Sequence, residues 1–205
     1  DGSAKNYKTV FGVILGSGCG GGLVINKKII SGSNNNAGEW GHNPLPYFGL
    51  IEDEVSPLSK DSVFVPNISI EKYVSGKGLE DLYFEKFKKK TSAGEIFKNQ
   101  KEKQKFIYNF YNRLSRSLST LINTIDPDVI VFGGGLSNEI NDLNLLKEMT
   151  GNFAGSSNLN TEFVKPMYGD ASGVRGAARL GKTTNDWIKY SYWEYQTFVF
   201  NIIII

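Results

Sequence analysis

Residues 10–26 of the 205-residue chain read VFGVILGSGCGGGLVIN, a glycine-rich segment between two apolar ones. Five of the seven residues at positions 16–22 are glycine, and such a run lets backbone N–H groups approach a ligand with no Cβ in the way. The commonest ligand of such a backbone concavity is an anionic phosphate. A tight hairpin turn alone needs one or two glycines, so the excess favours a loop that faces a ligand over a merely structural turn.

Two other interpretations of this loop compete with a hairpin. Gly16, Gly18 and Gly21 match the dinucleotide-binding pattern G-x-G-x-x-G, which requires a helix directly after the loop. Here apolar residues 23–25 are followed by Asn-Lys-Lys and another apolar pair, which predicts strand, turn and strand. Glu39 has about the spacing of a ribose-binding acid but does not end a strand, and no Gly-Lys-Ser/Thr closes a P-loop. The pattern therefore favours a hairpin whose glycine turn faces a nucleotide phosphate.

The composition is that of an ordinary globular protein, with 40% hydrophobic and 21% charged residues. The net charge of +2 gives no reason to expect nucleic acid or a membrane as a partner, and we expect neither. The single cysteine, Cys19, excludes an internal disulfide framework and fits a reducing compartment, so we expect a cytoplasmic protein. No signal peptide or membrane span is visible in the sequence.

The hydrophobic pattern predicts a succession of strands and helices. Residues 9–16 and 22–31 are rich in Val, Ile and Leu and predict strands. Residues 101–125 carry apolar side chains at steps of three and four, which predicts a long helix with one apolar stripe. Further helices are expected at 69–75, 79–90, from 92 onward, 143–149 and 169–179, and further strands at 129–132 and 162–165.

Two more segments carry candidate binding chemistry. Residues 32–46, GSNNNAGEWGHNPLP, form a loop by composition and contain Glu39 and His42, the only histidine. A Glu, a His and several Asn close together can bind a polyhydroxyl ligand, although a turn-rich connector with a satisfied His has the same composition. The apolar strand at 129–132 leads into three consecutive glycines, a common place for a ligand in an α/β sheet.

Taken together, these segments resemble the ROK family of bacterial sugar kinases, and within it the fructokinase-like members. The resemblance covers about residues 5–181 and is carried by VFGVILGSGCGGGLVINKKIISG, AGEWGHNPLP, IEKYVSGKGLE, IDPDVIVFGGGLSN and GDASGVRGAARLG. It implies an α/β fold of the actin-like ATPase class, with a ribonuclease H-like mixed sheet flanked by helices. It also implies that ATP and a sugar bind in the cleft between two domains.

The resemblance implies roles for three groups of residues. These are ATP phosphate binding by Gly16, Ser17 and Gly18, adenosine binding by Gly133, Gly134 and Gly135, and sugar binding by Glu39, His42 and Glu71. The sugar assignment agrees with the chemistry, because a carboxylate accepts strong hydrogen bonds from sugar hydroxyls. The resemblance further implies Mg²⁺ as the counter-charge for phosphoryl transfer, a hexose substrate with fructose favoured, and a homo-oligomer.

The catalytic aspartate of the family is expected upstream of Asp1 and would be the general base for the sugar hydroxyl. We therefore expect residues 1–181 to be a C-terminal nucleotide- and sugar-binding lobe, with no catalytic residue of its own and no kinase activity alone. Residues 182–205 are rich in aromatic side chains, end in four isoleucines and have no counterpart in the family.

Most ROK proteins bind a structural zinc ion through one His and three Cys. When the sequence is aligned on Glu71, Ser62, Phe64 and Ser69 stand at the cysteine positions. Serine is a poor zinc ligand and phenylalanine is none, so we expect no metal site, with His42 left available for the sugar.

Three functions are compatible with these features. The first is the lobe of an ATP-dependent hexose kinase, the second is the sugar-sensing domain of a ROK-type transcriptional repressor, and the third is a non-catalytic dimerising module. A binding titration separates them, because the kinase binds ATP and sugar, the sensor binds sugar only, and the module binds neither.

Overall fold

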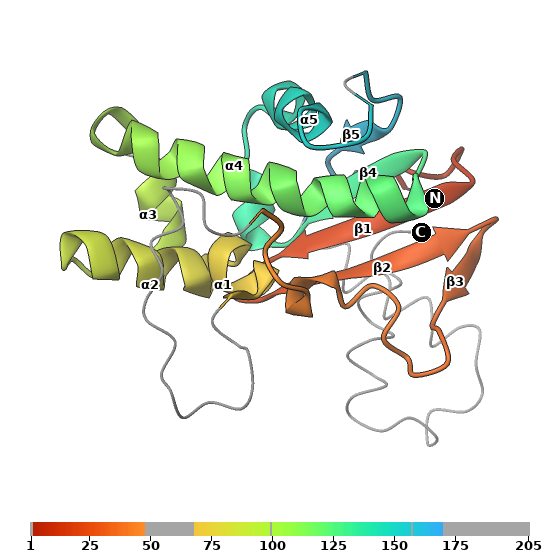
Figure 1. Cartoon of the computed structure of the whole chain (residues 1–205), viewed down its shortest axis with the longest axis horizontal. Helices are drawn as coiled ribbons and strands as arrows, with labels where there is room; N and C mark the ends of the chain where they lie inside the picture. The colour runs from red at the N-terminus through yellow and green to blue at the C-terminus, as the bar shows by residue number, and fades with distance from the viewer. Residues whose placement is uncertain (1, 48–67, 99, 157, 170–205) are drawn as a thin grey trace.

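The computed structural model describes residues 2–47, 68–98, 100–156 and 158–169 (Figure 1). Its centre is a five-stranded sheet in the order β3-β2-β1-β4-β5. The strands are β1 (Thr9–Leu15), β2 (Cys19–Ile25), β3 (Lys28–Ile30), β4 (Val129–Gly133) and β5 (Glu162–Val164). The first three are antiparallel neighbours, whereas β4 runs parallel to β1 and β5 parallel to β4. The mixed sheet with flanking helices, expected from the family resemblance, is confirmed.

The hairpin of β1 and β2 settles the interpretation of the glycine run. The register pairs Thr9 with Ile25 and Leu15 with Cys19, which leaves residues 16–18 as the turn. A strand follows this turn, so the dinucleotide-binding interpretation, which needs a helix there, is wrong. The strand begins at Cys19 instead of the expected position 22, because three of the glycines belong to β2.

The helices are α1 (Ile70–Val74), α2 (Gly76–Phe87), α3 (Ala93–Lys98), α4 (Gln100–Ile125) and α5 (Leu143–Gly151), with 3₁₀ turns η1 (Trp40–His42) and η3 (Gly135–Glu139). The helix expected over 79–90 is α2, which starts and ends earlier than expected. At its start Ser75 is the N-cap and accepts the N–H of Gly78, and at its end Lys88 adopts a left-handed conformation with φ 54°. The expected helix over 169–179 and the segment 182–205 lie outside the described residues. Among the helices described, none is long and apolar enough to cross a membrane.

The main core lies between one face of the sheet and the helices. Phe11, Val13 and Leu15 alternate along β1 and point to this face, which α4 crosses in Figure 1. The intervening residues of β1, β2 and β4 point to the opposite face, where Val10 and Val129 belong to a second, smaller cluster. The alternation fixes the orientation of β1, and with it the place where the turn at 16–18 emerges.

Helix α4 buries a polar stripe as well as the predicted apolar one. Arg116 is fully buried, and its Nη1 donates hydrogen bonds of 2.9 Å to the carbonyl oxygens of Pro46 and Tyr47. The guanidinium of Arg113 lies 5.1 Å from the ring centroid of Tyr73 in α1. The expectation of a single apolar stripe is therefore incomplete, because this helix also fastens α1 and the end of the loop at 32–46.

Candidate functional site

The loop at 32–46 lies directly on the backbone of β2. The indole Nε1 of Trp40 donates a hydrogen bond of 2.8 Å to the carbonyl oxygen of Gly20. A Cβ atom at Gly41 would lie only 2.1 Å from the carbonyl oxygen of Cys19, so no other residue type fits there without a shift. The side chains of Glu39 and His42, on either side of this contact, are thereby placed next to the hairpin.

Helix α1 is attached to the same loop by an antiparallel bridge. The N–H of Ile70 donates to the carbonyl oxygen of Asn43 at 2.8 Å, and the N–H of Leu45 donates to the carbonyl oxygen of Ile68 at 2.7 Å. Glu71 follows in the first turn of α1, where a carboxylate interacts favourably with the helix dipole. Residues from two distant parts of the sequence therefore meet at the hairpin turn.

A cavity of about 210 Å³ joins these segments. Its lining residues come from the hairpin, the loop and α1: Ile14, Gly16, Ser17, Gly18, Cys19, Gly20, Glu39, His42 and Glu71. All three residues of the predicted phosphate loop and all three predicted sugar-binding residues are among them. Pockets that enclose a whole ligand usually measure about 300–1,000 Å³, so the described residues form a small site.

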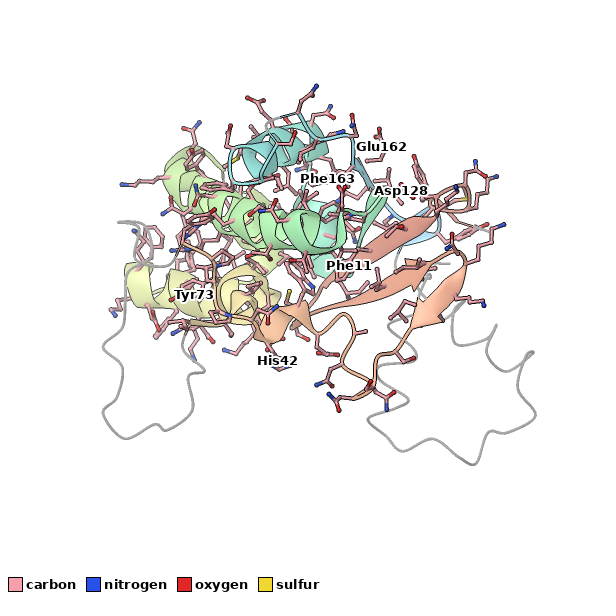
Figure 2. All side chains as sticks on the ribbon, turned by 45° about the vertical axis from the view of Figure 1, so that its right-hand side comes forward. Phe11, His42, Tyr73, Asp128, Glu162 and Phe163 are labelled. Carbon is pink, nitrogen blue, oxygen red and sulfur yellow. The ribbon has the colours of Figure 1, made fainter. Side chains whose placement is uncertain are left out.

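Two carboxylates and an imidazole give this cavity its chemistry. Nε2 of His42 lies 3.6 Å from Oε2 of Glu39, and the His42 side chain is 76% exposed at the lower rim of the molecule in Figure 2. Burial, reinforced by the negative charges of Glu71 and Glu39, raises the pKa of the Cys19 thiol well above its ordinary value, so the thiol stays neutral. The site thus offers charged hydrogen-bond acceptors, which suit a ligand rich in hydroxyl groups.

The start of α2 holds the turn at 16–18 through backbone hydrogen bonds. The N–H of Gly76 donates to the carbonyl oxygen of Gly16 at 2.7 Å, and the N–H of Lys77 donates to the carbonyl oxygen of Ser17 at 3.3 Å. The N–H of Gly16 donates to the carbonyl oxygen of Gly18 at 2.9 Å and closes the turn. Among the described residues no acceptor is recorded for the N–H groups of Ser17 and Gly18, which leaves two donors for an anion.

The second glycine cluster lies at the same edge of the sheet but outside this cavity. Gly133 at the end of β4 pairs with Ile14, just before the turn. Gly134 has φ 85°, and a Cβ there would lie 2.4 Å from the carbonyl oxygen of Leu15, so glycine is required. A Cβ at Gly135 would meet nothing within 4 Å, which leaves that backbone accessible. The adenosine role of these three residues remains a prediction.

Sequence reasoning missed two residues that build the site. Trp40 anchors the sugar loop to β2, and Gly76 anchors the phosphate turn to α2. A tryptophan in a loop of small polar residues was a usable signal, because a large side chain in such a loop normally packs on something. The role of Gly76 is a backbone contact between distant segments, for which the sequence holds no local sign.

In the described part of the chain, no three His, Cys, Asp or Glu side chains are arranged so that they could hold one metal ion. Ser69, at one expected cysteine position, caps α1 by accepting the N–H of Lys72. Positions 62 and 64 lie outside the described residues, so the absence of zinc stays a prediction.

A second cavity lies at the other end of β1. It has a volume of about 410 Å³ and is lined by Lys5, Asn6, Tyr7, Lys8, Asn26 and Lys27. Beside it, Asp128 accepts the backbone N–H groups of Lys8 and Thr9 at 2.9 and 2.8 Å. Figure 2 shows Asp128 and Glu162 well away from His42, so this end of the sheet is separate from the candidate site.

Comparisons with known proteins agree with this arrangement. The family model described as "ROK family" matches residues 1–184. An N-acetyl-D-glucosamine kinase of Yersinia enterocolitica is 36% identical over an alignment of 189 residues; the match covers 86% of this chain and 59% of that protein. The chain therefore spans about three fifths of the length of that relative.

Two solved structures share the fold at low sequence identity. A ROK family glucokinase from Streptomyces griseus, in complex with glucose and AMPPNP, has a TM-score of 0.69 at 18% identity, covering 89% of this chain and 63% of that one. A ROK family transcriptional regulator, a homolog of the E. coli MLC protein, has a TM-score of 0.63 at 15% identity, covering 80% of this chain and 43% of that one. The actin-like fold expected from the sequence is confirmed, and the chain belongs to the ROK family.

Proposed function

We propose that this chain carries the sugar-binding and ATP phosphate-binding portion of an ATP-dependent hexose kinase. The observation that supports it most is the single cavity shared by the turn at 16–18 and by Glu39, His42 and Glu71. A phosphoryl-transfer enzyme must bring the phosphate donor and the sugar hydroxyl together, because its catalysis consists mainly of positioning and electrostatic stabilisation.

Each group then has a distinct task. The N–H groups of Ser17 and Gly18, which have no acceptor among the described residues, bind phosphate oxygens, while the two carboxylates accept hydrogen bonds from sugar hydroxyls. The glycines at 133–135 contact the adenosine. The general base for the sugar hydroxyl is expected outside this sequence, as the family resemblance implies.

Phosphoryl transfer from ATP calls for a cation beside the phosphates, and Mg²⁺ fits this requirement. Mg²⁺ is commonly held by one or two carboxylates together with substrate phosphates, so a cluster of three protein ligands is not needed. The described residues contain no such cluster, which agrees with an ion that arrives with the nucleotide. Bound there, it would neutralise charge on the transferred phosphoryl group.

For the sugar we propose an N-acetylated aminohexose, N-acetylglucosamine first. The relatives at 34–37% identity are N-acetyl-D-glucosamine kinases, whereas the fructose expected from the resemblance finds no support among the proteins compared. Glucose is the second sugar to test, because it is the ligand of the Streptomyces griseus glucokinase structure.

A sugar-sensing domain of a repressor is the second candidate, favoured by the likeness to the ROK transcriptional regulator. Titration of the chain with AMPPNP and Mg²⁺, and separately with N-acetylglucosamine, glucose and fructose, distinguishes the two. Binding of both nucleotide and sugar supports the kinase, and binding of sugar alone supports the sensor. Binding of neither ligand supports a non-catalytic module, for which sedimentation would also test the predicted homo-oligomer.

An ADP-release assay on the same chain tests whether it has kinase activity without the expected catalytic aspartate. We expect no sugar-dependent ADP release, because the expected aspartate is not in this sequence. Measured turnover would mean that a base within the chain performs the deprotonation.

A further inference from the structure

Glu71 contacts the phosphate turn as well as the sugar cavity. Its Oε2 accepts the backbone N–H of Cys19, the residue directly after the turn, at 2.8 Å. A Cβ atom at Gly18 would lie 2.9 Å from the same oxygen, so glycine leaves room for the carboxylate. The other oxygen, Oε1, has no hydrogen bond recorded among the described residues, and Glu71 lines the cavity.

The other cavity acid, Glu39, provides an internal comparison. In the described part of the chain, the Glu39 carboxylate makes its polar contact with His42, whose Nε2 lies 3.6 Å from Oε2. The remaining bonds from α2 to the turn use the backbone N–H groups of Gly76 and Lys77, which side-chain substitutions leave in place. Of these two carboxylates, Glu71 is bonded to the residue that directly follows the turn, whereas Glu39 has no such bond among the described residues.

We infer that Glu71 is a positioning residue for the phosphate turn and couples sugar binding to nucleotide binding; this inference rests on the proposed function. A sugar hydroxyl bound to Oε1 restricts the carboxylate to one orientation. The oriented Oε2 holds the Cys19 N–H, which orders the neighbouring donors of Ser17 and Gly18 for phosphate. Since coupling between two ligands is reciprocal, bound nucleotide strengthens sugar binding by the same factor.

Electrostatics alone predicts the opposite direction. A carboxylate next to bound phosphates repels them, so removing the charge of Glu71 would strengthen nucleotide binding. The positioning role predicts weaker binding after truncation, because the Cys19 N–H loses its acceptor. Glu71→Gln removes the charge but keeps an acceptor oxygen, and it therefore separates the two effects.

The experiment uses the whole 205-residue chain and calorimetric titration with AMPPNP and Mg²⁺, first without sugar. We expect Glu71→Ala to weaken AMPPNP binding about five-fold or more, whereas Glu71→Gln and Glu39→Ala stay within about two-fold of the parent. In the parent, saturating N-acetylglucosamine strengthens AMPPNP binding by at least about five-fold, and Glu71→Ala abolishes this gain. Both alanine variants weaken sugar binding.

Amide hydrogen exchange at Cys19 gives a readout that needs no ligand, and it also reports whether the variants are folded. Faster exchange in Glu71→Ala than in Glu39→Ala supports the positioning role. The inference is overturned if Glu71→Ala binds AMPPNP as tightly as the parent or more tightly, or if Glu39→Ala loses as much affinity. A parent chain that binds neither ligand would overturn the proposed function itself, and this inference with it.

Discussion

Glycines on the two sides of Cys19 serve different purposes in the same short run. Before Cys19, no backbone covers the glycines of the turn at 16–18: a Cβ at Gly16 would meet nothing within 4 Å, and a Cβ at Gly18 would meet only the Glu71 carboxylate, at 2.9 Å. After it, β2 is closely covered: a Cβ at Gly21 would lie 2.7 Å from the carbonyl oxygen of Gly12 and 3.0 Å from that of Gly38. The first group leaves backbone accessible to a ligand, whereas the second lets the sugar loop pack against the strand.

The largest expected effect comes from filling the covered half. Gly21→Ala places a methyl group against the backbone atoms of Gly12 and Gly38, which cannot move aside as a flexible side chain would. We expect the free energy of unfolding to fall by about 2–3 kcal/mol, as overpacking usually costs. Urea denaturation of the purified chain measures this change as a lower midpoint at unchanged slope.

The matched control is Gly16→Ala, in the open half of the same run. We expect its free energy of unfolding to stay within about 0.5 kcal/mol of the parent, as for surface substitutions generally. Equal destabilisation by Gly16→Ala and Gly21→Ala would show that the turn at 16–18 is packed as tightly as β2, against the contacts seen in the structure.

The sequence predicted much of the fold because the relevant signals are local. Helix α4 follows from hydrophobic periodicity, whereas strands β1 and β4 follow from short continuous apolar runs, which suit strands buried on both faces. The start of β2 was missed because glycine has a low strand propensity, so the pattern placed the strand after the glycines. Its pairing with β1 and its cover by the loop at 32–46 override that propensity.

The rest of the site depends on contacts between distant segments. The helix expected at 69–75 is followed by Gly76, and a glycine directly after a helix is typical of its end. In the structure, Ser75 is also the cap of the next helix, and Gly76 holds the turn. The buried Arg116 was equally unpredictable, since its partners are carbonyl oxygens about seventy residues away in sequence.

The second prediction tests how the loop is held on the covered half. Trp40→Phe keeps an aromatic ring against Phe11, whose centroid lies 6.4 Å from that of Trp40, but removes the hydrogen bond to Gly20. Because a half-buried carbonyl oxygen loses its donor, we expect the free energy of unfolding to fall by about 1 kcal/mol. Sugar affinity should fall as well, since Glu39 adjoins Trp40.

Tyr47→Phe is the control for this substitution. Tyr47 packs on Phe153 at a centroid distance of 5.6 Å and is 58% exposed. We expect a change within about 0.5 kcal/mol on urea denaturation. If Trp40→Phe is as mild as this control, the indole hydrogen bond does not hold the loop.

The smallest effect concerns Cys19, which joins the open turn to the covered strand. Burial and the two nearby carboxylates raise the pKa of its thiol above the ordinary value of 9.0. Above that pH the unfolded chain has released the proton while the folded chain retains it, so the unfolded state binds fewer protons and stability falls as pH rises. Below pH 9 the contribution is fully present, and the slope above it is at most about 1.4 kcal/mol per pH unit for one group.

Cys19→Ala removes this titration and should flatten the decline of stability between pH 9 and 10. The buried Tyr111 also has a pKa raised above its ordinary value of 10.0, and it contributes to the decline equally in parent and variant. The cavity left by the substitution lowers stability equally at every pH, and the comparison therefore uses slopes from urea denaturation instead of absolute values. Parallel slopes for parent and variant would mean that the thiol is accessible to water, and that the boundary between the open and the covered half lies after Cys19.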